Sequence, residues 1–151
     1  MLIMKIRKIE LDDISLCAQL FSQVFSSSPW NESWNKESAG KRLLHFYESK
    51  GFIGILAERD GIVGFALGNS EPFYFGNMFY LREMCIVNDL QQQGLGKKLY
   101  LALERELSLA KIHSIYLTTH RETLASNFYV NNGFKASEKM GFYAKCIAHD
   151  K

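Results

Sequence analysis

The most constraining feature of the sequence is a stretch in which an apolar run passes through a glycine-containing loop into a helical pattern. Residues Phe79–Val87 are rich in aromatic and branched side chains, which favour a β-strand. Apolar residues recur at helical spacing over Leu95–Ala110, which predicts a helix with one buried face. Between them, residues 91–96 read QQQGLG, and two lysines follow. The chain must therefore fold so that a strand ends, turns within a few residues and enters a helix.

The composition of this loop suits a bound anion. The first turn of a helix exposes backbone N–H groups that have no partner within the helix, and it carries a partial positive charge. Gly94 and Gly96 let a phosphate approach these groups closely because glycine has no Cβ, and Lys97 and Lys98 add positive charge. A plain glycine turn is the alternative interpretation of these six residues taken alone.

Two other phosphate-binding patterns do not match the loop. The phosphate loop of nucleotide hydrolases needs Gly-x-x-x-x-Gly-Lys-Ser/Thr, but residues 94–98 read GLGKK and have neither the spacing nor the hydroxyl. A dinucleotide-binding fold needs Gly-x-Gly-x-x-Gly, and Leu99 stands where the third glycine would be. Both patterns are excluded by residues that can be read directly from the sequence.

The remainder of the chain alternates between strand-like and helical patterns without a repeat or a linker, so we expect one domain over residues 1–151. Asp60-Gly61 between two apolar runs is typical of a β-hairpin. The order of elements predicts an α/β or α+β sheet covered by helices on both faces. Besides the strand and helix above, the patterns predict strands at Met4–Ile9, Phe52–Glu58, Ile62–Ser70, Ser114–His120 and twice within Phe134–His149, and helices after Asp12, at Lys36–Ser49 and at Glu122–Asn131.

Composition excludes several classes of protein. The formal net charge of +2 is spread along the chain, which argues against the basic surface that nucleic-acid binding needs. Cys17, Cys85 and Cys146 are far apart and odd in number, so the sequence indicates neither a disulfide framework nor a metal site. No apolar run approaches the roughly 18 residues of a membrane span, and the N-terminus does not resemble a signal peptide. We therefore expect a cytoplasmic protein that binds neither nucleic acid nor a membrane.

Two motifs together resemble a known family. Residues 91–96 match Gln/Arg-x-x-Gly-x-Gly/Ala, and Ala125, Tyr129 and Gly133-Phe134 match Ala-x-x-x-Tyr-x-x-x-Gly-Phe. In this order, over Phe79–Phe134, they make the sequence similar to the GNAT superfamily of acyl-CoA-dependent N-acetyltransferases. The resemblance implies a mixed, mostly antiparallel central sheet of about six to seven strands with helices on both faces. It also implies that the strand before the loop splays from its neighbour at a bulge and leaves a V-shaped slot.

The resemblance implies acetyl-CoA as acyl donor and indicates residues that would bind it. Many relatives carry an asparagine where this chain has Arg121 and Glu122, which puts one cofactor contact in doubt. Lys98 is equally well interpreted as a solvated surface charge. The implied cofactor contacts are the main chain of Cys85, Ile86 and Val87 for the pantetheine arm, Gln91, Gln92, Gln93, Gly94, Leu95, Gly96, Lys97 and Lys98 around the pyrophosphate, and Asn127.

Amine acetylation needs a base for the amine and a proton for the departing thiolate. Tyr129 matches the family position of a tyrosine near the sulfur, and its hydroxyl suits a general acid. Glu83 is the candidate base, because burial raises the pKa of a carboxylate, and His120 is a second candidate. An ion pair between Arg82 and Glu83 is an alternative use of that carboxylate. Strict strand alternation argues against it, because it places the two side chains on opposite faces.

The acceptor side is predicted from aromatic residues. Trp30, Trp34, Phe73 and Tyr74 are candidate walls, with Glu32 or Glu71 near them to suit a cationic amine, while core or dimer packing is the alternative interpretation. The resemblance thus implies an enzyme that acetylates a primary amine of a small molecule or peptide by direct attack in a ternary complex. The alternative is an acyl-CoA-binding module of the same fold with little catalysis. The resemblance also implies a homodimer, which is common in this family.

Overall fold

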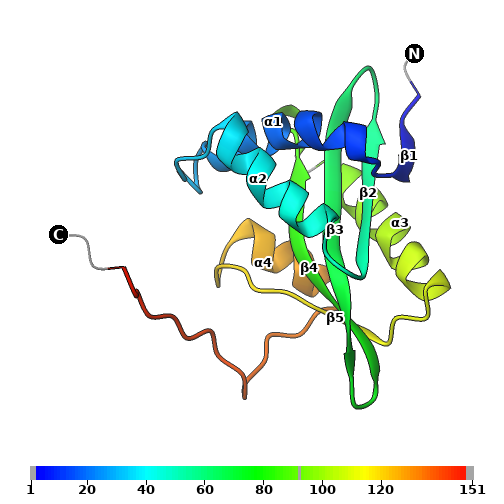
Figure 1. Cartoon of the computed structure of the whole chain (residues 1–151), viewed down its shortest axis with the longest axis vertical. Helices are drawn as coiled ribbons and strands as arrows, with labels where there is room; N and C mark the ends of the chain where they lie inside the picture. The colour runs from blue at the N-terminus through cyan, green and yellow to red at the C-terminus, as the bar shows by residue number, and fades with distance from the viewer. Residues whose placement is uncertain (1–2, 92, 149–151) are drawn as a thin grey trace. The chain divides into compact units, whose positions relative to one another are not determined.

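The chain forms helices and strands in an order close to the predicted one (Figure 1). A computed structural model describes residues 3–91 and 93–148, and it divides into two compact units, Met1–Leu117 and Thr118–Lys151. The first unit holds β1 (Lys5–Lys8), a short 3-10 helix (Leu11–Asp13), α1 (Ile14–Phe25), α2 (Lys36–Tyr47), β2 (Phe52–Glu58), β3 (Ile62–Phe73), β4 (Gly76–Ile86), a second 3-10 helix (Asn88–Leu90), α3 (Leu95–Leu109) and β5 (Ser114–Tyr116). The second unit holds α4 (Leu124–Asn131).

The five strands of the first unit form one sheet in the order β1-β2-β3-β4-β5. Neighbouring strands are antiparallel, except that β4 and β5 are parallel. The predicted hairpin between β2 and β3 is confirmed: Asp60 and Gly61 adopt positive φ angles of 59° and 109°, and the Arg59 N–H donates to the Gly61 carbonyl. The prediction of a mixed, mostly antiparallel sheet is therefore confirmed.

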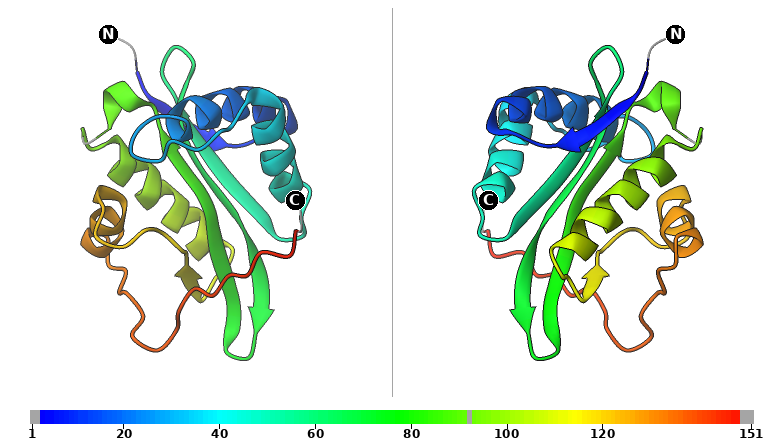
Figure 2. Two further views of the ribbon diagram at one scale, coloured as in Figure 1. Left: turned by 90° about the vertical axis from the view of Figure 1, so that its left-hand side faces the viewer. Right: turned by 90° about the vertical axis from the view of Figure 1, so that its right-hand side faces the viewer.

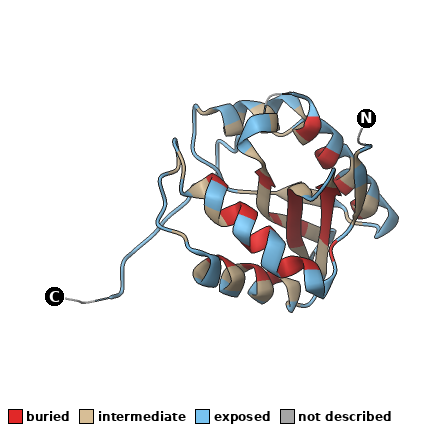
Figure 3. Cartoon of the chain, turned by 90° about the horizontal axis from the view of Figure 1, so that it is seen from above, coloured by how far each residue is buried: buried red, intermediate tan, exposed pale blue. Residues whose placement is uncertain are grey.

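Helices cover both faces of this sheet, as predicted. Figure 2 shows α1 and α2 on one face and α3 on the other. Buried residues concentrate in the strands and in stripes along the helices, where apolar side chains recur every three or four positions (Figure 3). The α1 and α2 face buries Cys17, Phe21, Leu43, Leu56, Phe65, Leu67 and Cys85 among others, and α3 buries Leu95, Leu99, Tyr100, Leu103 and Leu107.

An arginine joins β1 to the start of α1. The Arg7 guanidinium donates to both carboxylate oxygens of Asp13 at 2.8 Å and to Glu58 of β2 at 2.7 Å. The Asp13 carboxylate also accepts the Glu10 N–H at 2.7 Å. These contacts hold the pKa of Asp13 below its ordinary value, with the Arg7 hydrogen bonds as the largest cause. Asp13 is therefore a structural carboxylate at the edge of the first unit.

The segment Glu71–Asn77 lies between the predicted strands Ile62–Ser70 and Phe79–Val87, yet most of it belongs to the β3–β4 hairpin. β3 and β4 pair from Gly64 with Ile86 to Phe73 with Gly76, so only Tyr74 and Phe75 lie outside the strands. The hairpin is longer than expected because Glu71-Pro72-Phe73 continues the ladder, with Pro72 opposite Asn77. The aromatic residues of this segment therefore lie at a hairpin tip.

The predicted count of six to seven strands is higher than the five described strands. The two strands predicted within Phe134–His149 are wrong for residues 134–148, none of which belongs to a helix or strand. Alternating apolar residues favour an extended chain, but a strand exists only where a second strand pairs with it. Within this unit no such partner is described, and Met140, Phe142, Tyr143 and Ile147 are exposed. No helix of the described residues is long and apolar enough to cross a membrane.

Candidate functional site

The loop after β4 leaves the N-terminus of α3 open. Gly94 precedes the helix with φ of 87°, a left-handed conformation that favours glycine, and a Cβ built on it would meet no described atom within 4 Å. The first intrahelical bond runs from the Lys98 N–H to the Gly94 carbonyl. The N–H groups of Leu95, Gly96 and Lys97 precede that bond and are not used by the helix. The loop therefore offers backbone donors next to Gly94, around whose Cβ position no described atom lies within 4 Å.

Two of the predicted glutamines brace the loop with their side chains. The Gln91 amide donates to the Ile86 carbonyl at 2.9 Å and to the Asn88 side chain at 3.1 Å. The Gln93 amide donates to the Asp89 carbonyl at 2.9 Å. Gln92, also predicted as a cofactor contact, lies outside the described residues. Gln91 and Gln93 therefore stabilise the turn through hydrogen bonds to residues that precede it.

β4 is unpaired on one edge beyond its contact with β5. The two strands pair only over Met78–Tyr80 and Ser114–Tyr116, whereas β4 continues to Ile86. The Val87 N–H donates to the carbonyl of Val63 in β3. By alternation, Cys85 and Val87 direct their backbone groups toward β3, and Ile86 directs its own toward the opposite edge. Met84, which the sequence did not single out, shares the orientation of Ile86.

A bulge in β4 changes which face its side chains occupy. Leu67 pairs with Glu83 and Gly68 pairs with Leu81, so Arg82 is an extra residue in the ladder. Gly68 is required here because its Cβ would lie 2.0 Å from the Tyr80 carbonyl oxygen and 3.0 Å from the Arg82 nitrogen. The sheet therefore accommodates one additional residue opposite a glycine.

The faces on either side of the bulge follow from their neighbours. A Cβ on Gly68 would also meet Phe79 at 2.8 Å, on the face opposite the α1-packed Leu67, so Phe79 and Leu81 face α3. Beyond the bulge, Cys85 belongs to the buried cluster with α1 and α2, and Glu83 shares its face. The strict alternation assumed for Arg82 and Glu83 is wrong, because the bulge adds Arg82 on the α2-facing side that Glu83 already occupies.

Glu83 pairs with an arginine of α2. The Arg42 Nε donates to the Glu83 carboxylate at 2.5 Å, and the Arg42 guanidinium lies 4.8 Å from the Phe46 ring centroid and 6.0 Å from that of Trp34. Burial raises the pKa of Glu83 above its ordinary value, and the positive charge of Arg42 offsets part of this effect. The carboxylate is half-buried and retains a greater affinity for protons than an exposed glutamate.

Arg82 lies beside this pair on the same face. Its guanidinium carbon is 3.8 Å from the Tyr80 ring centroid and 5.2 Å from that of Phe46, and its Nε donates to the Asn69 side chain at 3.1 Å. Tyr80 in turn stacks on Tyr116 with centroids 4.5 Å apart. Arg42, Arg82 and Phe46 thus form a cluster around Glu83 that sequence reasoning did not identify, because its members come from separate elements.

Tyr116 extends the cluster toward the rim. Its hydroxyl donates to the Glu71 carboxylate. Burial and this carboxylate raise the pKa of Tyr116 to about 12, so the hydroxyl is protonated at neutral pH. Glu71 was predicted to lie near an acceptor amine, and in the structure it is engaged by a tyrosine.

The predicted aromatic walls separate into two places. Trp34 packs edge-on against Phe21 with centroids 4.9 Å apart, and its indole N–H donates to Glu32 at 2.7 Å. The ring centroids of Trp30 and Phe25 are 5.4 Å apart. The structure therefore brings Trp34 to Arg42 and places Trp30 in the same connection between α1 and α2.

Phe73 and Tyr74 lie apart from the Glu83 cluster. They pack with Phe75 at the hairpin tip, with ring centroids 4.9 to 5.2 Å apart. Glu83 lies seven positions after Gly76 in β4, which is about 20 Å along a strand. Tyr74 is 90% exposed. The structure does not bring these two aromatics to Glu83.

Tyr129 and Asn127 lie on α4 of the second unit. Thr123 caps this helix by accepting the Ser126 N–H, and the Thr123 N–H donates back to the Ser126 hydroxyl. The Tyr129 ring lies 5.3 Å from Phe128 and 5.4 Å from Phe134, and it is half-buried. Asn127 is exposed. The packing of Tyr129 on Phe134 explains why both residues belong to one motif.

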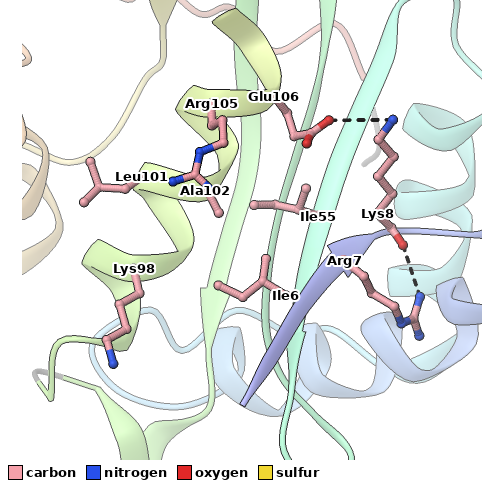
Figure 4. A pocket seen from close by; sticks show the side chains of 9 residues that line it. All are labelled: Ile6, Arg7, Lys8, Ile55, Lys98, Leu101, Ala102, Arg105 and Glu106. Carbon is pink, nitrogen blue, oxygen red and sulfur yellow. Dashed lines mark hydrogen bonds and ion pairs between the residues drawn. The ribbon is translucent and has the colours of Figure 1, made fainter. Parts of the chain in front are cut away.

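Lys98 lines a different hollow in the first unit. This hollow, of about 430 Å³, lies between β1 and α3 and is also lined by Ile6, Lys8, Leu101 and Arg105 (Figure 4). Lys8 pairs with Glu106 across it at 3.7 Å. Lys97 does not line the hollow, and both lysines are exposed. Among residues 3–91 and 93–148, no cluster of three or more His, Cys, Asp or Glu side chains lies close enough to hold a metal ion.

One family model matches most of the chain, and solved structures share its fold. A family model described as "Acetyltransferase (GNAT) domain" matches residues 17–149. Aminoglycoside N-acetyltransferase AAC(6')-Iy in complex with CoA is 19% identical, with a TM-score of 0.76 and coverage of 96% of both chains. AAC(6')-Iy in complex with the bisubstrate analogue CoA-S-monomethyl-acetylneamine is also 19% identical, with a TM-score of 0.73. The match covers 95% of this chain and 99% of that chain.

A third solved structure extends the comparison to another source. An aminoglycoside acetyltransferase from an uncultured soil metagenomic sample, in complex with sisomicin, is 19% identical, with a TM-score of 0.74 and coverage of 96% of this chain and 97% of that chain. No curated protein sequence gives a significant match. At these identities the solved structures show the fold.

Proposed function

Because the chain belongs to the GNAT family of acetyltransferases, we propose that it transfers an acetyl group from acetyl-CoA to a primary amine of a small molecule or peptide, by direct attack in a ternary complex. The observation that carries this proposal is the position of Glu83, whose pKa is raised. Its side chain lies on the α2-facing side of β4, beyond the point where the pairing of β4 with β5 ends at Tyr80. A base is thereby held at the start of an unpaired strand edge that leads to an open helix N-terminus.

The residues of this edge and loop fit the cofactor. Ile86 directs backbone groups to the open edge of β4, where an extended arm can pair with them. The N–H groups of Leu95, Gly96 and Lys97 and the unobstructed space at Gly94 suit a pyrophosphate. When bound, acetyl-CoA supplies the acetyl group as an activated thioester. The positive charges of Lys97 and Lys98 attract its phosphates, while the hydrogen bonds of Gln91 and Gln93 keep the loop in shape.

Glu83 accepts the proton of the amine, directly or through water. An amine with a pKa near 10 is mostly protonated at neutral pH, and only its neutral form is nucleophilic. The raised pKa of Glu83 matches it better to this transfer than an exposed glutamate would be. Cys85 is buried and its thiol pKa is raised well above the ordinary value, so it stays protonated and is a poor nucleophile. This supports direct attack by the amine.

For Tyr129 and Asn127 the proposal rests on their positions in the Ala125–Phe134 motif. The Tyr129 Oη would donate a proton to the leaving sulfur, and Asn127 would hydrogen-bond the cofactor. The matched family model spans both compact units, which supports one acetyltransferase domain over residues 1–151. Trp30 and Trp34 would line the acceptor site, and Phe73 and Tyr74 would contact only an acceptor that extends along the β3–β4 hairpin. The homodimer remains a prediction of the family resemblance, and the cytoplasmic location remains a prediction from the composition of the sequence.

Calorimetric titration with acetyl-CoA tests the cofactor site. A Gly94→Trp variant should lose binding, because the indole fills the space in front of α3. Gly61→Trp is the matched control, since Gly61 also has a positive φ angle and no described atom within 4 Å of its Cβ, but lies in the β2–β3 turn. Absence of binding to the unmodified protein, or equal binding to both variants, would contradict the proposed cofactor site.

Thiol release with a panel of primary amines then tests transfer. Tyr129→Phe should lower turnover far more than acetyl-CoA affinity if its hydroxyl donates the proton. Cofactor binding without turnover on any amine would favour an acyl-CoA-binding module over an enzyme. Unchanged turnover in Tyr129→Phe would remove that residue from the mechanism.

A further inference from the structure

Arg82 forms no direct ion pair among the described residues, although its positive charge acts on the neighbouring Glu83 carboxylate and favours its ionised form. The ion pairs among residues 3–91 and 93–148 involve Arg7, Lys8 and Arg42, and none includes Arg82. Its contacts are neutral: the Asn69 side chain accepts from its Nε, and two aromatic rings, Tyr80 and Phe46, flank its guanidinium. The guanidinium is thus held in place while its terminal nitrogens have no acceptor among the described residues.

The nearest carboxylates already have other partners. Glu83 pairs with Arg42, Glu71 accepts the hydroxyl of Tyr116, and Glu32 accepts the indole N–H of Trp34. Arg42 and Arg82 both lie within about 5 Å of the Phe46 ring, but only Arg42 forms an ion pair with Glu83. Arg82 is thus a second guanidinium, without an ion-pair partner among the described residues, beside the proposed base.

The position of Arg82 is a product of the bulge. A regular strand would not place two consecutive side chains on one face, and the glycine at position 68 makes room for the extra residue. The guanidinium is planar and presents paired donors that match a carboxylate, and stacking on aromatic rings limits the orientations of that plane. One fixed guanidinium without an ion-pair partner among the described residues is suited to one monoanionic group.

We propose that the acceptor amine also bears a carboxylate, and that Arg82 binds this carboxylate while Glu83 receives the proton of the amine. This assignment rests on the proposed function, since it concerns the acceptor side of the same site. A single guanidinium without an ion-pair partner suits a carboxylate, whereas a phosphate dianion usually requires more than one cation. An acceptor with several amino groups and no anion would be repelled by Arg82.

Paired acceptors test the proposal. The common amino acids, each as the free acid and as its amide, are titrated calorimetrically into protein saturated with CoA, and the same pairs are assayed for thiol release with acetyl-CoA. The best free acids should bind about tenfold to a hundredfold more tightly than their amides, the usual range for a charged hydrogen bond. Arg82→Met should abolish this preference, and Arg82→Lys should retain only part of it because lysine lacks the planar fork.

Arg59→Met is the matched control, because it removes the same charge from an exposed turn. Circular dichroism verifies that each variant is folded. Equal binding of acids and amides, or a preference that persists in Arg82→Met, would overturn the proposal. If free acids bind preferentially through Arg82 but no amine is acetylated, the carboxylate site stands and the proposed function fails. If transfer occurs equally to acids and amides, the proposed function stands and the carboxylate site fails.

Discussion

Two carboxylates of the first unit are each bound by an arginine, yet their proton affinities shift in opposite directions. Asp13 accepts two hydrogen bonds from Arg7 and one from a backbone N–H, and its pKa is lowered. Glu83 accepts one bond from Arg42 inside a half-buried cluster, and its pKa is raised. The difference is the number of donors set against the cost of burial. An arginine partner alone therefore does not make a carboxylate structural.

The two shifts also make opposite contributions to stability. A lowered pKa means that Asp13 stabilises the fold above its ordinary value near 3.8, and this contribution is lost as the pH falls through the folded-state pKa. A raised pKa means that ionising Glu83 costs stability as the pH rises through its ordinary value of 4.5 toward the higher folded-state value. Burial of Glu83 thus lowers the stability of the fold when the carboxylate is ionised, and it raises the proton affinity of that carboxylate.

The largest effect is expected from Glu83→Gln. Removing a general base should lower kcat by about 10²- to 10⁴-fold, with little change in acetyl-CoA affinity. The rate of the unmodified enzyme should fall as the pH drops through the raised pKa of Glu83, and this limb should be absent in the variant. Steady-state kinetics over a pH series measure both effects. Glu37→Gln, an exposed change in α2, is the control, and an equal loss in that variant would contradict the assignment.

A smaller but substantial effect is expected from Gly68→Ala. The added Cβ would lie 2.0 Å from the Tyr80 carbonyl, so the bulge must shift at a cost of about 1–3 kcal/mol, and Glu83 must shift with it. Chemical denaturation and kcat should both report a loss. Gly40→Ala makes the same chemical change within α2, where the nearest atom is 4.0 Å away, and should be neutral or stabilising. Full activity in Gly68→Ala would mean that the bulge does not position Glu83.

Asp13→Asn should affect stability and leave the chemistry intact. Losing charged hydrogen bonds to Arg7 should cost about 1–2 kcal/mol at pH 7, and the difference from the unmodified protein should shrink below pH 4 as Asp13 is protonated. Urea denaturation at several pH values measures this change. A large fall in kcat of the folded variant would break the contrast between the two carboxylates.

Arg42→Met is expected to produce the smallest change, and it sharpens the comparison most directly. The positive charge of Arg42 lowers the pKa of Glu83 against the effect of burial, so removing it should move the acidic limb of the rate profile to higher pH. Above that limb kcat should stay close to that of the unmodified enzyme. Lys41→Met, an exposed change on the same helix, is the control. A limb that does not move would show that the titrating group is not Glu83.

Sequence patterns predicted those features that depend on neighbouring residues. The hairpin at Asp60-Gly61, the helical stripe of α3 and the glycine loop are all encoded within short windows, and the structure agrees with each. Glu83 was also identified as a buried carboxylate with a raised pKa. These features require no knowledge of what packs against them.

Features that depend on distant residues could not be predicted. Arg42 and Glu83 are 41 positions apart, and Tyr116 and Glu71 are 45 apart, so no local pattern connects them. The bulge at Arg82 cannot be recognised from the sequence pattern. One extra residue only reverses which positions of the strand alternate between its two faces, and this leaves no distinctive pattern of its own. The strands predicted within Phe134–His149 failed for the opposite reason: their local pattern is clear, but strand pairing depends on a partner elsewhere.

The register around Arg82 has a consequence for insertions and deletions. Leu67 and Gly68 are consecutive, whereas their partners Glu83 and Leu81 are separated by Arg82. Deleting Arg82 would close the ladder into a regular one and keep Phe79, Leu81, Glu83 and Cys85 on their present faces. A shortened chain would therefore retain its core and lose only the guanidinium. Arg82 is an insertion that the fold tolerates opposite Gly68. Deleting this one residue of β4 would show whether the guanidinium is needed for substrate binding, because the sheet does not depend on it.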